Sequence, residues 1–175
     1  MNIPRRNILR RNGFTLVEIL VALVVLSVGL LGIGKLMLFS SRANDSAYMR
    51  SQATALAYTI LDNMRANLTD AVNGLYGVGL GAYGNPGFAC DDASPCTTTG
   101  QLAQYDLYQW KSAMQAALPS GDGTVTTAQS ADPITGATIT MATITVQWND
   151  AVAQQSFGAV APAVQLQTIT LESQL

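Results

Sequence analysis

An uninterrupted apolar stretch near the amino end is the feature that most constrains this chain. No charged residue occurs from Ile19 to Gly34. About 20 largely apolar residues lie between Phe14 and Lys35, which is enough to cross a bilayer as an α-helix. Residues 1–13 contain four arginines and no acid, the arginines being Arg5, Arg6, Arg10 and Arg11. The positive-inside rule then predicts a cytoplasmic amino end, with everything after Lys35 beyond the membrane.

The helical pattern continues past the apolar stretch. No proline interrupts residues 14–67, and apolar residues then recur at steps of three and four, as on one face of a helix. These residues are Ala53, Ala57, Ile60, Met64 and Leu68, with Leu61 beside them. We therefore expect one long helix with a membrane half and an amphipathic half. Asn67 and the Asn73-Gly74 pair are its candidate stop signals.

Two ordinary explanations of such an amino end are a secretory signal peptide and a plain signal anchor. A signal peptide is disfavoured, because no Ala-x-Ala-like site follows the apolar run and the run exceeds a usual h-region. A plain signal anchor would leave Glu18 unexplained. A carboxylate inside an apolar membrane helix costs about 2–3 kcal/mol and normally has a partner.

Charge and composition exclude several function classes. Charged residues make up 11% of the 175 residues, and histidine, the commonest general base and metal ligand, is absent. After Arg65 the chain has one base, Lys111, against eight acids, which gives that part a net charge of −7. An acidic distal part argues against nucleic-acid binding, which needs a basic surface. We expect no catalytic residue, no metal site and no cofactor, and hence no enzyme.

The segment Gly13-Phe14-Thr15-Leu16-Val17-Glu18 resembles the type III signal of type IV prepilins and pseudopilins. It follows a short basic leader and precedes an apolar helix, as in that family. The resemblance implies that a membrane prepilin peptidase cuts between Gly13 and Phe14, and that Phe14 is then N-methylated. It also implies that Glu18 is the assembly carboxylate, which pairs with the new ammonium group of a neighbouring subunit in the fibre core.

Three later segments are similar to the PilV-type minor pilins, also known as type IV pilus modification proteins. They are Tyr48–Tyr58, Asp62–Asn67 and Tyr105–Lys111. This narrower resemblance implies a minor pilin that helps to initiate a type IV pilus and is incorporated into it or at its tip, with roles in adhesion and motility. The alternative is a minor pseudopilin of a type II secretion system. A membrane-anchored periplasmic enzyme is a third, less favoured reading.

The resemblance also implies partners and a location. The partners are the prepilin peptidase, the other minor pilins, the major pilin and the inner-membrane assembly platform, and a tip adhesin is a further candidate. The chain would span the bacterial inner membrane once, with its amino end cytoplasmic and its head periplasmic. It would then leave the membrane for the pilus fibre at the cell surface.

We expect an α+β fold in four parts. Residues 1–13 form the cleaved leader, 14–39 the transmembrane or fibre-core helix, 40–73 the amphipathic half of that helix, and 74–175 the periplasmic head. In the head we expect a glycine-rich loop over 74–100 and a helix over Gln101–Leu118, begun by a Thr98–Gln101 capping box. Strands are expected over Thr124–Gln129, over the region Ile139–Trp148 with a bulge or a break between strands near Ala142-Thr143, and over Val164–Leu171 with a similar phase slip.

Particular residues of the head carry further expectations. Cys90 and Cys96 are the only cysteines and should form a disulfide in an oxidising periplasm. A zinc site without histidine and a redox pair without C-x-x-C spacing are the weaker alternatives. The G-x-G-x-x-G match at residues 79–84 is interpreted as a loop, because no strand precedes it. Trp110 and Trp148 are expected in the core. Asp91, Asp92 and Asp122 are expected to be solvated loop acids.

Overall fold

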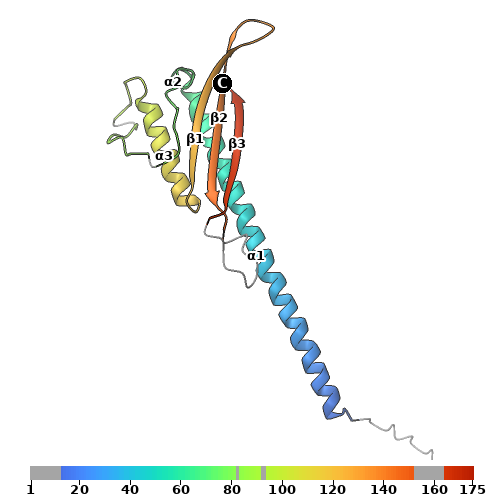
Figure 1. Cartoon of the computed structure of the whole chain (residues 1–175). Helices are drawn as coiled ribbons and strands as arrows, with labels where there is room; N and C mark the ends of the chain where they lie inside the picture. The colour runs from blue at the N-terminus through green and yellow to red at the C-terminus, as the bar shows by residue number, and fades with distance from the viewer. Residues whose placement is uncertain (1–12, 82, 92–93, 152–163) are drawn as a thin grey trace, which may run out of the picture. The chain divides into compact units, whose positions relative to one another are not determined.

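The computed structural model describes residues 13–81, 83–91, 94–151 and 164–175, and Figure 1 shows its elements. The helices are α1 (Leu16–Ala66), α2 (Leu68–Val72) and α3 (Gln101–Ala117), and the strands are β1 (Asp122–Ala131), β2 (Thr138–Asn149) and β3 (Leu166–Gln174). A long amino-terminal helix, a further helix and a small antiparallel sheet confirm the predicted α+β fold class. The leader before Gly13 lies outside the described residues.

The chain divides into two compact units, Met1–Ser41 and Arg42–Leu175, and α1 contributes residues to both. In the first unit, every described residue, from Gly13 to Ser41, is exposed. The helix continues through Gly29, Gly32 and Gly34 without a break, although each glycine weakens a helix by about 1 kcal/mol relative to alanine. The first unit therefore presents an apolar helical surface that none of its described residues covers.

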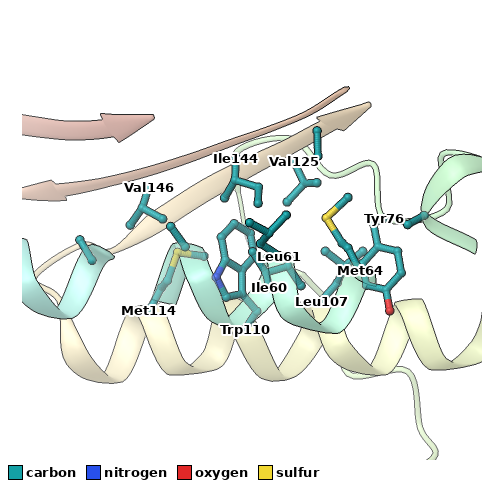
Figure 2. Close-up of a cluster of buried hydrophobic side chains, with 14 of the residues drawn as sticks. Ile60, Leu61, Met64, Tyr76, Leu107, Trp110, Met114, Val125, Ile144 and Val146 are labelled. Carbon is teal, nitrogen blue, oxygen red and sulfur yellow. The ribbon is translucent and has the colours of Figure 1, made fainter. Parts of the chain in front are cut away.

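The second unit contains the core. Its sheet is antiparallel with the order β1-β2-β3, and side chains from the sheet, from α1 and from α3 form one buried cluster. Figure 2 shows Trp110 of α3 and Ile60 of α1 within this cluster, with Ile144 of β2 across from them. Trp110 is anchored as well as buried, because its Nε1 donates to the carbonyl of Leu56 at 2.9 Å. Trp148 is 1% exposed, so both tryptophans lie in the core as predicted.

The prediction of a bulge or a strand break near Ala142-Thr143 in β2 is wrong. The strand pairs with β1 and β3 in an unbroken register through Ala142 and Thr143. Its inner face is buried from Thr140 onward, and the buried residues of that face are Thr140, Ala142, Ile144, Val146 and Trp148. Ile139 and Met141 therefore lie on the opposite face, half-buried. The sequence suggests a change in which residues of β2 face the core, because small and hydroxyl side chains occupy inner positions where large apolar residues are expected. The phase slip expected in β3 is likewise absent, since its register with β2 is continuous.

The end of α1 follows the predicted stop signals and changes the direction of the chain. Asn67 separates α1 from the short α2, and Asn73 is the C-cap of α2. Leu68 is 47% exposed, so its predicted place in the apolar stripe is wrong, whereas the stripe residues before Asn67 are buried. Helical periodicity does not carry across a break, which explains this single error.

The start of α3 lies where it was predicted but is stabilised differently. Gly100 is the N-cap, with φ of 81°, a conformation that favours glycine, and no side chain caps the helix there. The Oε1 of Gln101 accepts a hydrogen bond from the Thr98 N–H at 3.0 Å, but the reciprocal bond of a capping box is absent. Instead, the Asp70 carboxylate accepts from the Gly100 N–H at 3.1 Å. That contact joins α2 to α3, and a local motif could not predict it.

Candidate functional site

Thr15 determines where α1 begins. Its backbone carbonyl accepts hydrogen bonds from the N–H groups of Glu18 and Ile19 at 3.1 and 3.3 Å. Its Oγ1 also accepts from the Glu18 N–H, at 3.3 Å. A threonine followed three residues later by glutamate is the pattern of a capping box. Thr15 therefore caps the helix, a role that the sequence analysis missed although the spacing was visible.

Gly13 and Phe14, the residues on either side of the predicted cut, precede the helix. Both are exposed and lie outside regular secondary structure, and Phe14 is 80% exposed. A Cβ atom at Gly13 would meet nothing within 4 Å. Packing within the described chain thus gives no reason for glycine at this position. The bond between the two residues is accessible to another protein.

Glu18 lies in the first turn of α1, where the helix macrodipole favours an anion. The side chain is exposed and stands at an open apolar groove along one side of the helix. This groove is lined by Phe14, Glu18, Ile19, Ala22, Leu23 and Leu26. A lone carboxylate beside apolar side chains is suited to attract a cationic group once water is excluded.

The helix that carries Glu18 is long and apolar enough to cross a membrane. Its best window of 18 residues has a mean hydropathy of 2.8, and none of that window is buried. Ser27, the polar side chain within the apolar stretch, donates its hydroxyl proton to the carbonyl of Leu23 one turn earlier. Its polar group is therefore satisfied inside the helix, as an apolar surrounding requires.

In the head, Lys111 is the main correction to the sequence analysis. The sequence shows it only as the one base after Arg65, yet it is 2% exposed and its Nζ forms an ion pair with Asp122. The Nζ also donates to the carbonyls of Gly79 at 2.8 Å, Gly81 at 3.2 Å and Gly123 at 2.6 Å. Lys111 thus joins α3 to the glycine-rich loop and to the start of β1. We refer to this group as the Lys111 clamp.

Asp122 is accordingly not a solvated loop acid, and that prediction is wrong. Burial acts to raise the pKa of its carboxyl group, but hydrogen bonds from Lys111 and from the N–H groups of Gly81 and Gly123 outweigh it. The pKa therefore lies below its usual value. Asp91 accepts a hydrogen bond from the Ser94 N–H at 2.7 Å, and Asp92 lies outside the described residues.

A second buried polar group surrounds Tyr76, which is 0% exposed. Its hydroxyl donates to the Asp106 carboxylate at 2.6 Å and accepts from Asn67 Nδ2 at 3.4 Å. Burial, with the hydrogen bond to Asp106 next in weight, raises the pKa of Tyr76 well above its usual value. Burial also raises the pKa of Asp106, and the hydrogen bond from Tyr76 partly offsets this. The group holds the α1–α2 junction against α3.

The glycine-rich segment is a loop with several attachments. Its Val78 exchanges two backbone hydrogen bonds with Val125 of β1, both at 3.0 Å. Further along, Cys90 and Cys96 are joined as a disulfide, with Cα atoms 5.1 Å apart. Within the described residues, no group of three or more His, Cys, Asp or Glu side chains is arranged to hold a metal.

The structure thus brings Gly13, Phe14 and Glu18 together at the start of α1, and it places the cysteines in the other unit. Residues 8–34 match a family model described as the prokaryotic N-terminal methylation motif. No curated protein and no solved structure is significantly similar to the chain. The motif implies processing by a prepilin peptidase and suggests a structural protein. Together with the apolar helix and the α+β fold, it supports a type IV pilin-like protein.

Proposed function

We propose that this chain is a minor pilin, which helps to initiate a type IV pilus and becomes part of the fibre or of its tip. The observation that carries this proposal is the methylation motif on an apolar helix whose described residues up to Ser41 are all exposed. A helix with such a surface needs either lipid or other helices around it. A pilus subunit meets both surroundings in turn.

Cleavage reduces the positive charge at the start of the helix, as its entry into an apolar fibre core requires. A cut after Gly13 removes all four leader arginines and leaves a single ammonium group on Phe14. N-methylation of Phe14 keeps that positive charge. In a dry bundle of helices an ammonium group needs an anion, and Glu18 of a neighbouring subunit can supply one. A paired charge costs far less in an apolar surrounding than a lone one.

The minor-pilin assignment and its partners draw on the similarity of three segments to PilV-type proteins. One of them, Tyr105–Lys111, lies in α3 and contains Trp110 and Lys111, which are both buried. The partners would be the other minor pilins, the major pilin and the inner-membrane assembly platform, with a tip adhesin as a further candidate. The resemblance in this segment therefore concerns the packing of the head as well as its surface.

The proposed orientation places the amino end in the cytoplasm and residues 42–175 in the periplasm. The basic leader supports it through the positive-inside rule. The Cys90–Cys96 disulfide supports it too, because disulfides persist in oxidising compartments. A thiol assay on the protein isolated from membranes tests the disulfide. We expect it to find no free thiol. Two free thiols would contradict both the disulfide and this compartment.

Amino-terminal sequencing of the protein from membranes and from sheared filaments tests the proposal directly. We expect both samples to begin with methylated Phe14. An intact Met1 start on filament-borne protein would refute the proposal. Deletion of the gene then separates the pilus from its alternative. Loss of surface pili supports the minor pilin, whereas intact pili with failed protein secretion would indicate a pseudopilin of a type II secretion system.

A further inference from the structure

The two edges of the sheet β1-β2-β3 differ in the contacts that they make within the described chain. At the β1 edge, Val78 pairs with Val125, and the side chain of Gln129 donates to the carbonyl of Val72 at 2.8 Å. At the other edge, β3 pairs with β2 and with no other described strand. A free edge offers a row of backbone donors and acceptors to any extended chain that approaches it.

The backbone bonds at both ends of β3 show which residues face the free edge. The Asp150 N–H donates to the Gln165 carbonyl at 2.8 Å, and the Leu175 N–H donates to the Thr140 carbonyl at 2.9 Å. Backbone groups along an antiparallel strand alternate between its two sides. Odd-numbered residues of β3 therefore face β2. The N–H and C=O groups of Thr168, Thr170 and Glu172 face outward.

The residues of β3 itself include none of the sequence features that usually prevent edge pairing. Proteins protect such edges with proline, lysine, bulges or very short strands. β3 has nine residues, contains no proline and no basic residue, and keeps a continuous register with β2. Glu172 is its single charged side chain. Nothing in β3 itself therefore opposes a further strand.

The apolar core is also less completely buried beside β3 than beside β2. Ile144 and Val146 of β2 are 0% exposed, whereas their neighbours on β3, Leu171 and Ile169, are only half-buried against the same cluster. An added strand would place its inward side chains beside this half-buried row. It would thereby remove apolar surface from water, which favours association.

We propose that the outer edge of β3 is a docking site for an extended segment of another subunit of the same assembly, which adds a fourth strand to the sheet. The inference rests on the proposed function, because that function supplies the assembly. Only an extended backbone matches the outward N–H and C=O groups at their spacing along β3. The docking segment alternates apolar and polar residues, and it is uncharged or basic opposite Glu172, since like charges across a strand pair destabilise it.

The test removes one outward N–H without disturbing the ladder to β2. In cells that lack the chromosomal copy, we expect full-length Thr170→Pro to reach the membrane at the normal level and to be cleaved. Its incorporation into filaments should fall at least tenfold. Thr170→Ala, which changes only the side chain, should be incorporated like the wild type. A Thr168→Lys, Thr170→Lys variant, which leaves the backbone groups intact, should also fail to be incorporated because its charges block edge pairing.

Cross-linking identifies the occupant. Thr168→Cys, labelled with a benzophenone maleimide, should yield a cross-linked peptide from another subunit that carries a methylation motif. Thr126→Cys, an exposed threonine on β1, is the matched control and should not yield that product. A product that contains two copies of this chain would overturn the choice of occupant. Equal incorporation of wild type, Thr170→Pro and the lysine variant would overturn the docking site while leaving the proposed function intact. Wild-type protein that is absent from filaments would remove the proposed function and this inference with it.

Discussion

Glu18 is the only charged side chain between Phe14 and Gly34, and its position in the first turn of α1 gives it two possible effects. It can stabilise the helix start through the macrodipole, and it can pair with the ammonium group of a neighbour. The first effect is worth about 0.3–1 kcal/mol at an exposed site. The second is larger in a dry fibre core, because a lone buried charge is costly.

Substitution of Glu18 tests the pairing role. We expect Glu18→Gln and Glu18→Ala to be cleaved normally, since the bond between Gly13 and Phe14 is unchanged, and to enter filaments at least tenfold less than the wild type. Quantitative immunoblots of membranes and sheared filaments measure both quantities. Asp45→Asn, which removes an exposed acid from the same helix, is the control. Equal amounts of mutant and wild type in filaments would contradict the pairing role.

Lys111 shows how burial changes the value of an ion pair. Lys111→Met removes the cation, which leaves three carbonyl groups without this donor and Asp122 without its ion-pair partner. We expect the free energy of unfolding of residues 42–175 to fall by about 3 kcal/mol. Arg65→Met is the matched control, because Arg65 and Asp62 are paired 3.8 Å apart but exposed. An exposed pair contributes about 0–1 kcal/mol. Similar losses in the two variants, measured by denaturant unfolding, would contradict the buried clamp.

The Lys111 clamp also predicts that the free energy of unfolding falls at low pH. The pKa of Asp122 is lower in the folded protein than the ordinary value of about 3.9 that applies to the unfolded chain. Its contribution is therefore fully present above about pH 4 and is lost as the pH falls through the folded pKa. Unfolding curves between about pH 2 and 5 should show this decline below about pH 4. Asp122→Asn should flatten it, and an unchanged slope would show that other carboxyl groups cause the decline.

At the scale of elements, α3 and β1 approach so closely that Gly123 has no room for a side chain. A Cβ atom there would lie 2.5 Å from the Thr145 carbonyl oxygen and 2.7 Å from the Trp110 ring. The first neighbour is backbone and cannot move aside. Gly123 thus permits the contact between helix and sheet that closes this side of the core.

Gly123→Ala tests that contact. We expect it to destabilise residues 42–175 by about 1–3 kcal/mol, the usual range for overpacking. Gly84→Ala is the matched control, because a Cβ atom at Gly84 would meet nothing within 4 Å. Thermal unfolding followed by circular dichroism compares the two variants. Equal melting temperatures would indicate that β1 can shift away from α3 without cost.

At the scale of the whole molecule, the two units require different surroundings, water for one and an apolar environment for the other. Residues 42–175 contain every buried residue among those described, so this unit can be stable in water by itself. The described part of the other unit buries nothing and must leave water for lipid or for neighbouring helices. Cleavage after Gly13 is the step that we expect to permit the move from one apolar surrounding to the other.

Gly13→Val should therefore trap the chain. A β-branched side chain at the cut site is expected to prevent cleavage, so the four arginines stay attached and hold the amino end at the cytoplasmic face. The precursor should accumulate in the membrane and be absent from filaments. An immunoblot with a size marker for the mature form provides the measurement. A mature-sized band would refute the requirement for glycine, and Asn12→Ala, one residue further from the cut, serves as the control.

The amino-terminal half of the protein could be predicted from its sequence because its chemistry is local. An apolar run, its flanking charges and the six residues from Gly13 to Glu18 need no distant partner to be recognised, and the family match at residues 8–34 agrees with them. Periodicity likewise predicted α1 and α3, because a helix repeats its pattern within a few residues.

Tertiary structure decided what depends on residues far apart in the chain. Lys111 and Asp122 meet across a turn and hold a loop some 30 residues earlier in the sequence, and Asp70 accepts a hydrogen bond from the N–H of Gly100, 30 residues away. The phase of β2 was set by its neighbours on both sides, which bury Thr140 and Ala142 although neither residue is a large apolar one. Such contacts stabilise a particular arrangement through burial and complementary charge, and no short stretch of sequence contains both partners.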